Sequence, residues 1–318
     1  MTASALRALL ASGQVTHVPG IYDPATAALA VAAGNRAVHL SAVAVSATML
    51  GRSDLGFVQA TQIADRAATL VPALRGTPLL ADADTGYGAP RHAVWTGLAY
   101  SRAGISGLHL DDRVNPGRGG PPAGREVIGT GLAAATVRAL ADQVPDLAIV
   151  ARTDAYAVNG LADTIARCVA YAEAGADAVF PEGVRDIGEL AAISRALPGV
   201  PLVVSRSEAA AQLPAWTDAD LARVGVRLVL HPVAALLAAM RAASVTYRAI
   251  AETGSAETRN AEAQNAETRS AEPRNADARN AETRTAEPVE RMPWAAFTAL
   301  AAQDEPLDAR YVPDRLQT

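Results

Sequence analysis

Ionisable side chains follow short apolar runs at many points along the first 232 residues. The positions are Asp82 and Asp84, Asp111 and Asp112, Arg152 and Asp154, Glu182, Arg206 and Glu208, and His231. A buried carboxylate must be paired, protonated or bound to a metal, and a hard divalent cation is the simplest partner for several acids together. We therefore expect a Mg²⁺ site with several retained waters, for which Mn²⁺ is an alternative ion. Arg152 could then neutralise a substrate carboxylate or a developing enolate.

The same residues also admit a purely structural interpretation. They could form a network of aspartate–arginine salt bridges that closes one end of the fold. Asp112 could pair with Arg113, and Asp154 could cap the loop after its strand. His109 and His231 are interpreted as core or supporting residues rather than metal ligands. Both interpretations of the whole set stay open at the level of the sequence.

The apolar runs that precede these groups predict eight buried strands. They lie near residues 15–23, 37–42, 77–84, 107–112, 147–154, 176–183, 201–207 and 227–232. Between them, apolar residues at i, i+3 and i+4 predict helices, and strands alternating with helices indicate a parallel sheet covered on both faces. Eight such units match a (β/α)8 TIM barrel, in which functional groups gather at the carboxyl ends of the strands. A doubly wound open sheet is the alternative, but no GxGxxG motif follows the first strand.

Three segments of different composition predict the domain organisation. Residues 1–254 contain the barrel pattern and form the predicted catalytic domain. Residues 255–288 repeat a five-residue unit such as AETRN, whose period fits neither a helix nor a strand, and they are predicted to be a disordered linker. Residues 289–318 form a C-terminal segment in which 293–303 predict a short amphipathic helix that docks on the barrel or on a neighbouring subunit.

Composition excludes several classes of function. The 318-residue chain has no lysine, which excludes a Schiff-base aldolase, a pyridoxal-phosphate enzyme and a P-loop NTPase. Its net charge of −5, without a basic stripe, argues against a nucleic-acid partner. We find no secretory leader and no membrane-spanning apolar run, so we expect a soluble, cytoplasmic protein. The single cysteine, Cys168, lies in a helical pattern and is predicted to be a core residue.

Four motifs resemble the isocitrate lyase/phosphoenolpyruvate mutase superfamily, and within it most closely the 2-methylisocitrate lyases. The motifs are DADTGYG at 82–88, GLHLDDRVNP at 107–116, ARTDA at 151–155 and FPEG at 180–183. The similarity runs in order through residues 5–250. The resemblance implies a (β/α)8 barrel and a homo-oligomer, usually a tetramer whose last helices are exchanged between neighbouring subunits.

The resemblance also implies roles for individual residues. Asp82 would bind Mg²⁺ directly, while Asp54, Asp84 and Asp111 would hold its waters. We expect catalytic roles for Arg152, Asp54 and Arg118. A small carboxylate substrate would be bound by Ser41, Ala42, Arg152, Glu182, Ser205 and Gly120.

One loop departs from the pattern of 2-methylisocitrate lyases. Their mobile loop reads KRCGH, and its cysteine is the general acid that protonates the leaving enolate. Residues 117–125 here read GRGGPPAGR, in which Gly117, Gly119 and Pro121 replace the lysine, cysteine and histidine, while Arg118 and Gly120 remain. Glycine cannot transfer a proton, and loss of a positioned acid costs about 10²–10⁴ in rate. Ser205 also replaces an asparagine that contacts substrate in the family.

These observations predict a Mg²⁺-dependent lyase that cleaves a C–C bond of a small 2-hydroxy or 2-oxo carboxylate through a metal-stabilised enolate. Both a methylisocitrate lyase-like and an oxaloacetate decarboxylase-like reaction fit. Of these reactions, decarboxylation depends least on the loop acid, because it needs only an electron sink and water can protonate the product. The alternatives are P–C chemistry of the phosphonopyruvate and phosphoenolpyruvate mutase type, and a catalytically idle barrel that serves as a binding scaffold.

Overall fold

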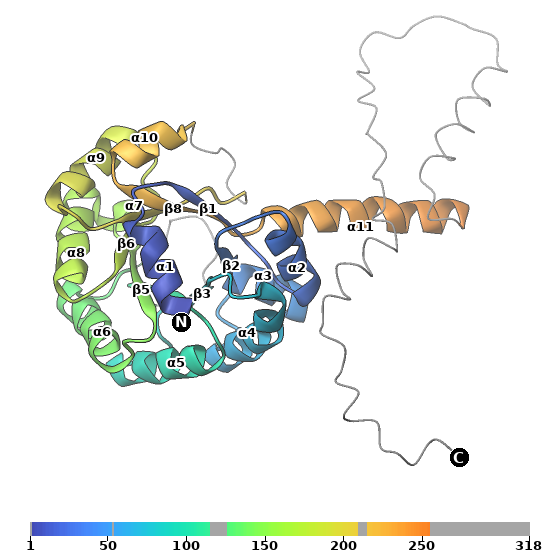
Figure 1. Ribbon diagram of the computed structural model, residues 1–318, viewed down its shortest axis with the longest axis horizontal. Helices are drawn as coiled ribbons and strands as arrows, with labels where there is room; N and C mark the ends of the chain where they lie inside the picture. The colour runs from blue at the N-terminus through green and yellow to red at the C-terminus, as the bar shows by residue number, and fades with distance from the viewer. Residues whose placement is uncertain (1, 53, 115–125, 209–214, 255–318) are drawn as a thin grey trace, which may run out of the picture. The chain divides into compact units, whose positions relative to one another are not determined.

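The computed structural model describes residues 2–52, 54–114, 126–208 and 215–254. The chain divides into two compact units, Met1–Leu236 and Leu237–Thr318, which are taken separately below. The first unit contains eight parallel strands, drawn as arrows in Figure 1. They are β1 (Thr16–Pro19), β2 (Val38–Leu40), β3 (Leu79–Asp82), β4 (Gly107–Asp111), β5 (Ala148–Thr153), β6 (Ala178–Pro181), β7 (Leu202–Ser205) and β8 (Val226–His231).

The strands form a sheet that curls into a nearly closed barrel, so the predicted (β/α)8 fold is confirmed. Their order is β1-β8-β7-β6-β5-β4-β3-β2, with every pair parallel. The gap between β1 and β2 is bridged by Gly20 and His39, and the amide of Ile21 donates to the carbonyl of His39 at 2.9 Å. A Cβ atom on Gly20 would lie 2.0 Å from the carbonyl oxygen of Pro232. Glycine is therefore required where β1 passes the end of β8.

Helices alternate with the strands along the chain, and those that connect one strand to the next lie around the barrel (Figure 1). The helices of the described residues are α1 (Thr2–Ala11), α2 (Pro24–Ala32), α3 (Ala42–Leu50), α4 (Ala60–Leu74), α5 (Pro90–Arg102), α6 (Thr130–Gln143), α7 (Tyr156–Asn159), α8 (Leu161–Glu173), α9 (Ile187–Ala196), α10 (Asp218–Arg223) and α11 (Ala234–Thr253). Local sequence explains their starts: Asp23 caps α2 by accepting the amide of Thr26 at 2.7 Å, and Pro24 occupies the first turn.

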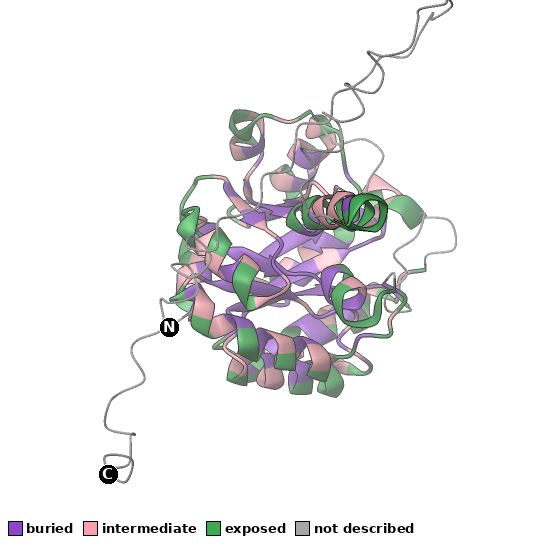
Figure 2. Ribbon diagram, turned by 90° about the vertical axis from the view of Figure 1, so that its right-hand side faces the viewer, coloured by how far each residue is buried: buried purple, intermediate pink, exposed green. Residues whose placement is uncertain are grey.

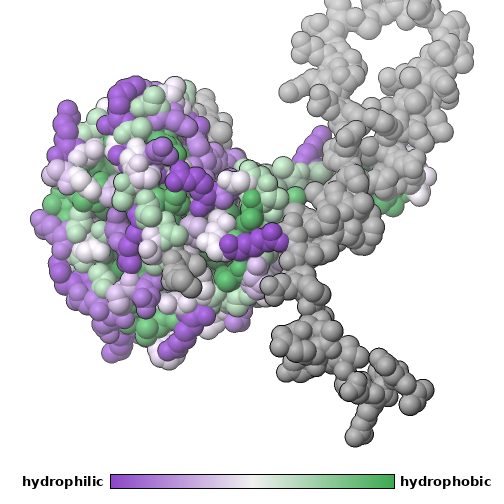
Figure 3. Space-filling model, viewed as in Figure 1, coloured by the Kyte–Doolittle hydropathy of each residue, from purple (hydrophilic) through white to green (hydrophobic). Residues whose placement is uncertain are grey.

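The barrel has an inner and an outer hydrophobic layer. The inner layer contains side chains such as Val150, Phe180 and Leu228, which alternate along their strands with residues that face the helices. The outer layer lies between the strands and helices, and Figure 2 shows the buried strands in purple inside helices whose outer faces are green. On the face of the barrel unit drawn in Figure 3, hydrophilic residues alternate with hydrophobic areas.

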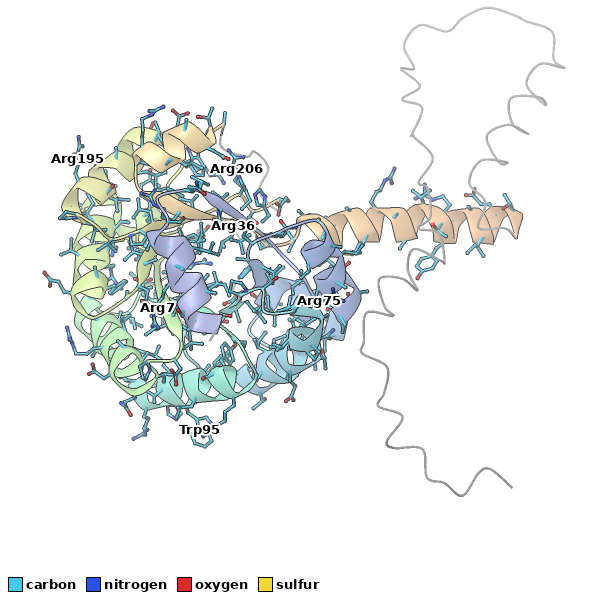
Figure 4. The ribbon with its side chains drawn as sticks, viewed as in Figure 1. Arg7, Arg36, Arg75, Trp95, Arg195 and Arg206 are labelled. Atoms are coloured by element: carbon cyan, nitrogen blue, oxygen red, sulfur yellow. The ribbon has the colours of Figure 1, made fainter. Side chains whose placement is uncertain are left out.

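Helix α1 covers the amino-terminal opening of the barrel. Leu6 of α1 is fully buried among the inner side chains, and a Cβ on Gly107 would lie 2.6 Å from its Cδ2. Arg7, labelled in Figure 4, holds the helix in place by donating to Asp177 at 2.7 and 3.1 Å and to the carbonyl of Leu147 at 2.9 Å. Apolar side chains thus fill the amino-terminal end of the barrel, and the polar groups inside it lie at the carboxyl ends of the strands.

The second unit begins within α11, whose residues Leu237, Met240, Tyr247 and Ile250 are exposed. Across the described ranges, no helix is both long and apolar enough to cross a membrane. The predicted linker 255–288 and C-terminal segment 289–318, with its helix at 293–303, lie outside the described residues. The domain organisation therefore stays a prediction.

Candidate active site

Strand alternation places the predicted polar residues inside the barrel at its carboxyl end. On β4, His109 and Asp111 face the interior, whereas Leu108 and Leu110 belong to the outer hydrophobic layer. The ends of β3, β5, β6 and β7 contribute further groups to the same region. These groups are Asp82, Arg152, Glu182 and Ser205.

Asp82, His109 and Asp111 form the centre of this region. Each offers one potential ligand atom, and the three atoms lie within 4.8 Å of one another. His109 Nδ1 is 3.4 Å from Asp111 Oδ1 and 3.7 Å from Asp82 Oδ1. Asp82 is held by the amides of Asp84 and Ala42, which donate to its two carboxylate oxygens at 2.9 and 3.3 Å. The arrangement is therefore preformed from two neighbouring strands, β3 and β4.

Two further carboxylates, Asp54 and Asp84, lie beside this centre, and the charges of Asp82 and Asp111 oppose their ionisation. Burial and then the charges of Asp111 and Asp82 raise the pKa of Asp84 to about 8. Burial and the charge of Asp82 also raise the pKa of Asp54. A buried group of oxygen donors with excess negative charge is the donor set that suits a hard divalent cation. The residues present therefore fit the cation that the sequence predicts.

Arg113 also lies inside this cluster. Its Nε and Nη2 donate to Asp111 Oδ2 at 3.0 and 2.6 Å, and Nη2 donates to Asp84 Oδ1 at 3.2 Å. Burial opposes ionisation of Asp111, but the charges of Arg152 and Arg113 outweigh it and hold the pKa of this carboxyl below its usual range. The structural interpretation allowed Asp112 to pair with Arg113, but Arg113 pairs with Asp111 and Asp84 instead.

Asp112 faces the opposite way, into the layer between the strands and α8. Its partners are Thr153 Oγ1 (2.7 Å), Tyr171 OH (2.7 Å), Arg167 Nη1 (3.0 Å) and the amide of Asp154 (3.0 Å). The cause is the pleat of β4, which directs two consecutive residues to opposite faces. Asp112 is therefore a structural acid rather than a member of the inner cluster.

Arg152 and Asp154 form an ion pair at the end of β5. Arg152 Nε and Nη2 donate to the two oxygens of Asp154 at 3.0 and 3.1 Å. Arg152 Nε lies 3.6 Å from Asp111 Oδ1, and Nη1 lies 3.8 Å from Glu182 Oε2. Asp154, for which a loop cap was one possible role, is thus a partner of Arg152. The aspartate–arginine network of the structural interpretation exists together with the acidic cluster.

The first turn of α3 borders Asp82. Ser41 and Ala42 join β2 to α3, both are buried, and the Ala42 amide points at Asp82. Amides at a helix N-terminus favour a negatively charged ligand. Asp54 lies buried in the loop after α3, where its Oδ1 accepts the amide of Gly56 at 3.4 Å. These three residues therefore stand where a carboxylate substrate and a cation could meet.

The remaining predicted residues have different positions. Ser205 ends β7 and is half-buried, on the inward register of Val203. Arg118 and Gly120, with the whole loop 117–125 and its Gly119, lie outside the described residues. The predicted loss of the loop acid therefore stays a prediction.

Other strand-end groups bind one another. His231 Nε2 lies 3.0 Å from His17 Nδ1, and its Nδ1 lies 3.1 Å from Glu208 Oε1. Arg206, labelled in Figure 4, donates to the carbonyl of Trp216. These contacts support the interpretation of His231 as a supporting residue.

Two histidines lie at the centre of the site, of which sequence reasoning missed His39 and interpreted His109 as a core or supporting residue. His39 Nε2 lies 3.1 Å from His109 Nε2, and both rings are buried. Burial, the charge of His109 and the charge of Arg152 lower the pKa of His39. His109 was expected in the core or in support, yet it offers a ligand atom beside Asp82 and Asp111. Its spacing of two residues from Asp111 on one strand was the available signal.

A cavity of about 300 Å³ adjoins the inner residues. Its lining includes Asp111, Arg113 and Arg152, together with Leu110, Val137 and Tyr171 of the outer hydrophobic layer. Ser41, Glu182 and Ser205 do not line it. Space of this size suits a small molecule with an acidic end and a short apolar part.

Comparison with known proteins identifies the family. The model of the phosphoenolpyruvate phosphomutase family matches residues 6–251. The chain belongs to the phosphoenolpyruvate mutase/isocitrate lyase superfamily. It is 34% identical to a 2-methylisocitrate lyase of Bacillus subtilis (strain 168) over 253 residues, which cover 80% of this chain and 83% of the relative. It is 32% identical to a 2,3-dimethylmalate lyase of Eubacterium barkeri over 243 residues, covering 76% and 83%.

A solved structure of the superfamily shows the same architecture. Oxaloacetate acetylhydrolase in complex with the inhibitor 3,3-difluorooxalacetate superposes with a TM-score of 0.76 at 30% identity, covering 81% of this chain and 88% of that one. The resemblance expected from the four motifs is thus confirmed. The relatives identify the chain as a carbon–carbon lyase of this superfamily and leave its reaction open.

Proposed function

We propose that this superfamily member cleaves a C–C bond of a small 2-hydroxy or 2-oxo carboxylate with the help of Mg²⁺ or Mn²⁺. The observation that carries the proposal is the convergence of Asp82, His109 and Asp111 at the carboxyl end of the barrel, with ligand atoms within 4.8 Å of one another. Arg152 lies beside them, 3.6 Å from Asp111. Acids on rigid strand ends with an adjacent guanidinium suit a reaction that develops negative charge on oxygen.

Asp82 would hold the cation, and Asp54, Asp84 and Asp111 would hold its waters. When bound, the ion supplies a Lewis acid that polarises a 2-oxo or 2-hydroxy group and offsets the charge of an enolate. The rigidity of Asp82, fixed by the amides of Ala42 and Asp84, favours a defined ligand direction.

The protein's own residues would orient the substrate. Ser41 and the amides at the start of α3 would receive one carboxylate, and the Arg152 guanidinium would balance a second negative charge. Glu182 and Ser205, at the ends of the next two strands, would complete the pocket and bind hydroxyl or oxo groups.

The substitution of glycine at position 119 favours reactions that need no positioned loop acid. Loss of the C3 carboxylate of a 2-oxo diacid such as oxaloacetate releases carbon dioxide and leaves an enolate that water can protonate. Release of a larger carbon acid gains more from a side-chain donor. We therefore place oxaloacetate-type substrates first and 2-methylisocitrate or 2,3-dimethylmalate second. Arg118 is the candidate in the same loop for stabilising the leaving group.

The test is product release from a panel of oxaloacetate, 2-methylisocitrate, isocitrate, 2,3-dimethylmalate and phosphonopyruvate. Pyruvate is followed with lactate dehydrogenase, and glyoxylate, oxalate and acetate are measured separately, with Mg²⁺, with Mn²⁺ and with EDTA. We expect cation-dependent turnover of at least one C–C substrate. Turnover of phosphonopyruvate alone would favour P–C chemistry, and silence across the panel from folded protein would favour an idle scaffold.

Asp82→Ala is the decisive variant. We expect it to lose cation binding and turnover together, by about 10³-fold or more in rate, because the reaction loses its main electrostatic stabilisation. Asp65→Ala removes an exposed acid on α4 and serves as the matched control with unchanged turnover. Full activity in Asp82→Ala would contradict the proposed role of the cation.

We also propose that the enzyme is a homo-oligomer, as the resemblance implies. The exposed residues Leu237, Met240, Tyr247 and Ile250 of α11 support this, since exposed apolar side chains grouped on one helix suit a contact with another subunit. Light scattering after size-exclusion chromatography measures the mass; a monomer at micromolar concentration would contradict the proposal.

A further inference from the structure

Arg113 is a buried cation inside a cluster that the proposed function assigns to a metal ion. It follows β4, is held by a bridge to Val127, and is 8% exposed. Its guanidinium contacts two acids of the inner cluster, Asp111 at 2.6 Å and Asp84 at 3.2 Å. A third acid, Asp154, lies 3.8 Å away. One arginine thus donates hydrogen bonds to two of the carboxylates that would hold the waters of the ion, Asp84 and Asp111.

Both oxygens of Asp111 already have positively charged or polar neighbours. Oδ2 accepts two hydrogen bonds from Arg113, while Oδ1 lies 3.4 Å from His109 and 3.6 Å from Arg152. On Asp84, Oδ1 is bound by Arg113. A divalent cation that approaches these oxygens, or its waters, must share them with a fixed guanidinium and is repelled by its charge.

The same contact has a benefit for the protein without the ion. Asp54, Asp82, Asp84 and Asp111 lie close together and largely out of water, where unpaired carboxylates destabilise the fold. Arg113 offsets part of this repulsion and fixes the direction of two of the acids.

We propose that Arg113 is a built-in countercharge that keeps the acidic cluster folded without a metal ion and thereby weakens its affinity for divalent cations. This inference rests on the proposed function, because it takes the cluster as the cation site. It implies that the enzyme exchanges its ion readily and depends on the free concentration of the ion.

The experiment compares Arg113→Gln, which removes the charge and keeps a side chain able to hydrogen-bond, with Arg113→Lys, which keeps the charge. Mn²⁺ binding is measured by electron paramagnetic resonance, and thermal unfolding is measured in EDTA and in Mn²⁺. We expect Arg113→Gln to bind Mn²⁺ roughly tenfold more tightly or better, because a like charge a few ångströms away is gone. Its melting temperature in EDTA should fall, and Mn²⁺ should raise it more than in the parent protein.

Two further variants separate this effect from a general loss of packing. Arg167→Gln removes another buried guanidinium, which binds Asp112 and Asp163, and should destabilise the fold without changing Mn²⁺ affinity. If Arg113→Gln does not fold in EDTA, the comparison uses Asp84→Asn with and without Arg113→Gln. The double variant loses one negative and one positive charge together. It should bind Mn²⁺ more tightly than Asp84→Asn alone.

The outcomes are distinct. Equal Mn²⁺ affinity in the parent and in Arg113→Gln, or weaker binding in the variant, overturns the countercharge and leaves the proposed function standing. Absence of Mn²⁺ binding in every protein overturns both. Tighter binding together with lower stability in EDTA supports the inference.

Discussion

Replacing Asp112 by alanine tests whether two adjacent acids have different roles. Asp111 faces the inner cluster, whereas Asp112 accepts four hydrogen bonds from groups packed between the strands and α8. Burial raises the pKa of Asp112, and hydrogen bonds from Thr153 and Tyr171 act in the opposite direction. Its contribution is therefore to satisfy buried donors rather than to gain energy from its own charge.

The expected loss follows from what the substitution leaves behind. Arg167 Nη1 loses one partner, and breaking a buried pair in this way costs about 3–5 kcal/mol. Arg167 keeps Asp163 at 2.8 Å and the carbonyl of Ile128 at 2.8 Å, which places the expected loss near the lower end, about 3 kcal/mol. For a domain of this size the melting temperature should fall by roughly 6–12 °C.

The assay is urea unfolding followed by circular dichroism, together with Mn²⁺ binding. Asp163→Ala is the matched control, because its carboxylate also binds Arg167 but is 29% exposed, and it should cost below about 1 kcal/mol. Asp112→Ala should bind Mn²⁺ like the parent, whereas Asp111→Asn should bind it poorly. A loss of under 1 kcal/mol, or weakened Mn²⁺ binding in Asp112→Ala, would refute the assigned orientation of the two acids.

Two further predictions concern the frame of the barrel. Gly20→Ala would place a Cβ 2.0 Å from the Pro232 carbonyl, so we expect a loss of about 2 kcal/mol or more in urea unfolding; Gly131→Ala on α6, with open space around it, should cost nothing. A stable Gly20→Ala protein would mean that the barrel closes differently. The second prediction concerns Cys168, whose thiol pKa is raised by burial to about 12, so that the thiol is protonated at pH 8. Iodoacetamide should therefore label Cys168 only after unfolding, which mass spectrometry can measure. Labelling of the native protein at the rate of the unfolded chain would contradict its placement.

The strands and the polar groups at their ends were predictable because a parallel barrel makes a strong local signal. Each strand is covered on both faces and therefore reads as an apolar run, such as LLAD before Asp82. A polar residue that ends such a run lies at the carboxyl edge, so Asp82, Asp111 and Arg152 were expected together. Cys168 was likewise expected in the core from its helical pattern, and it is fully buried.

The partners of those groups could not be predicted in the same way. Whether Asp111 or Asp112 faces inward depends on the pleat and on the last residue of β4, and a shift by one residue exchanges the two faces. Arg113 therefore donates hydrogen bonds to Asp84 and Asp111 rather than to Asp112. Only the folded chain places these charges within hydrogen-bond distance.

The sequence by itself determined the number of strands, their alternation with helices, the acidic character of their carboxyl ends and the family to which the chain belongs. The tertiary structure decided which of these acids lie together and what lies beside them. His39 and His109 are 70 positions apart, yet their Nε2 atoms lie 3.1 Å apart because the barrel curves their strands around one axis. Long-range closeness of this kind depends on strand order and register, which no local pattern of residues encodes.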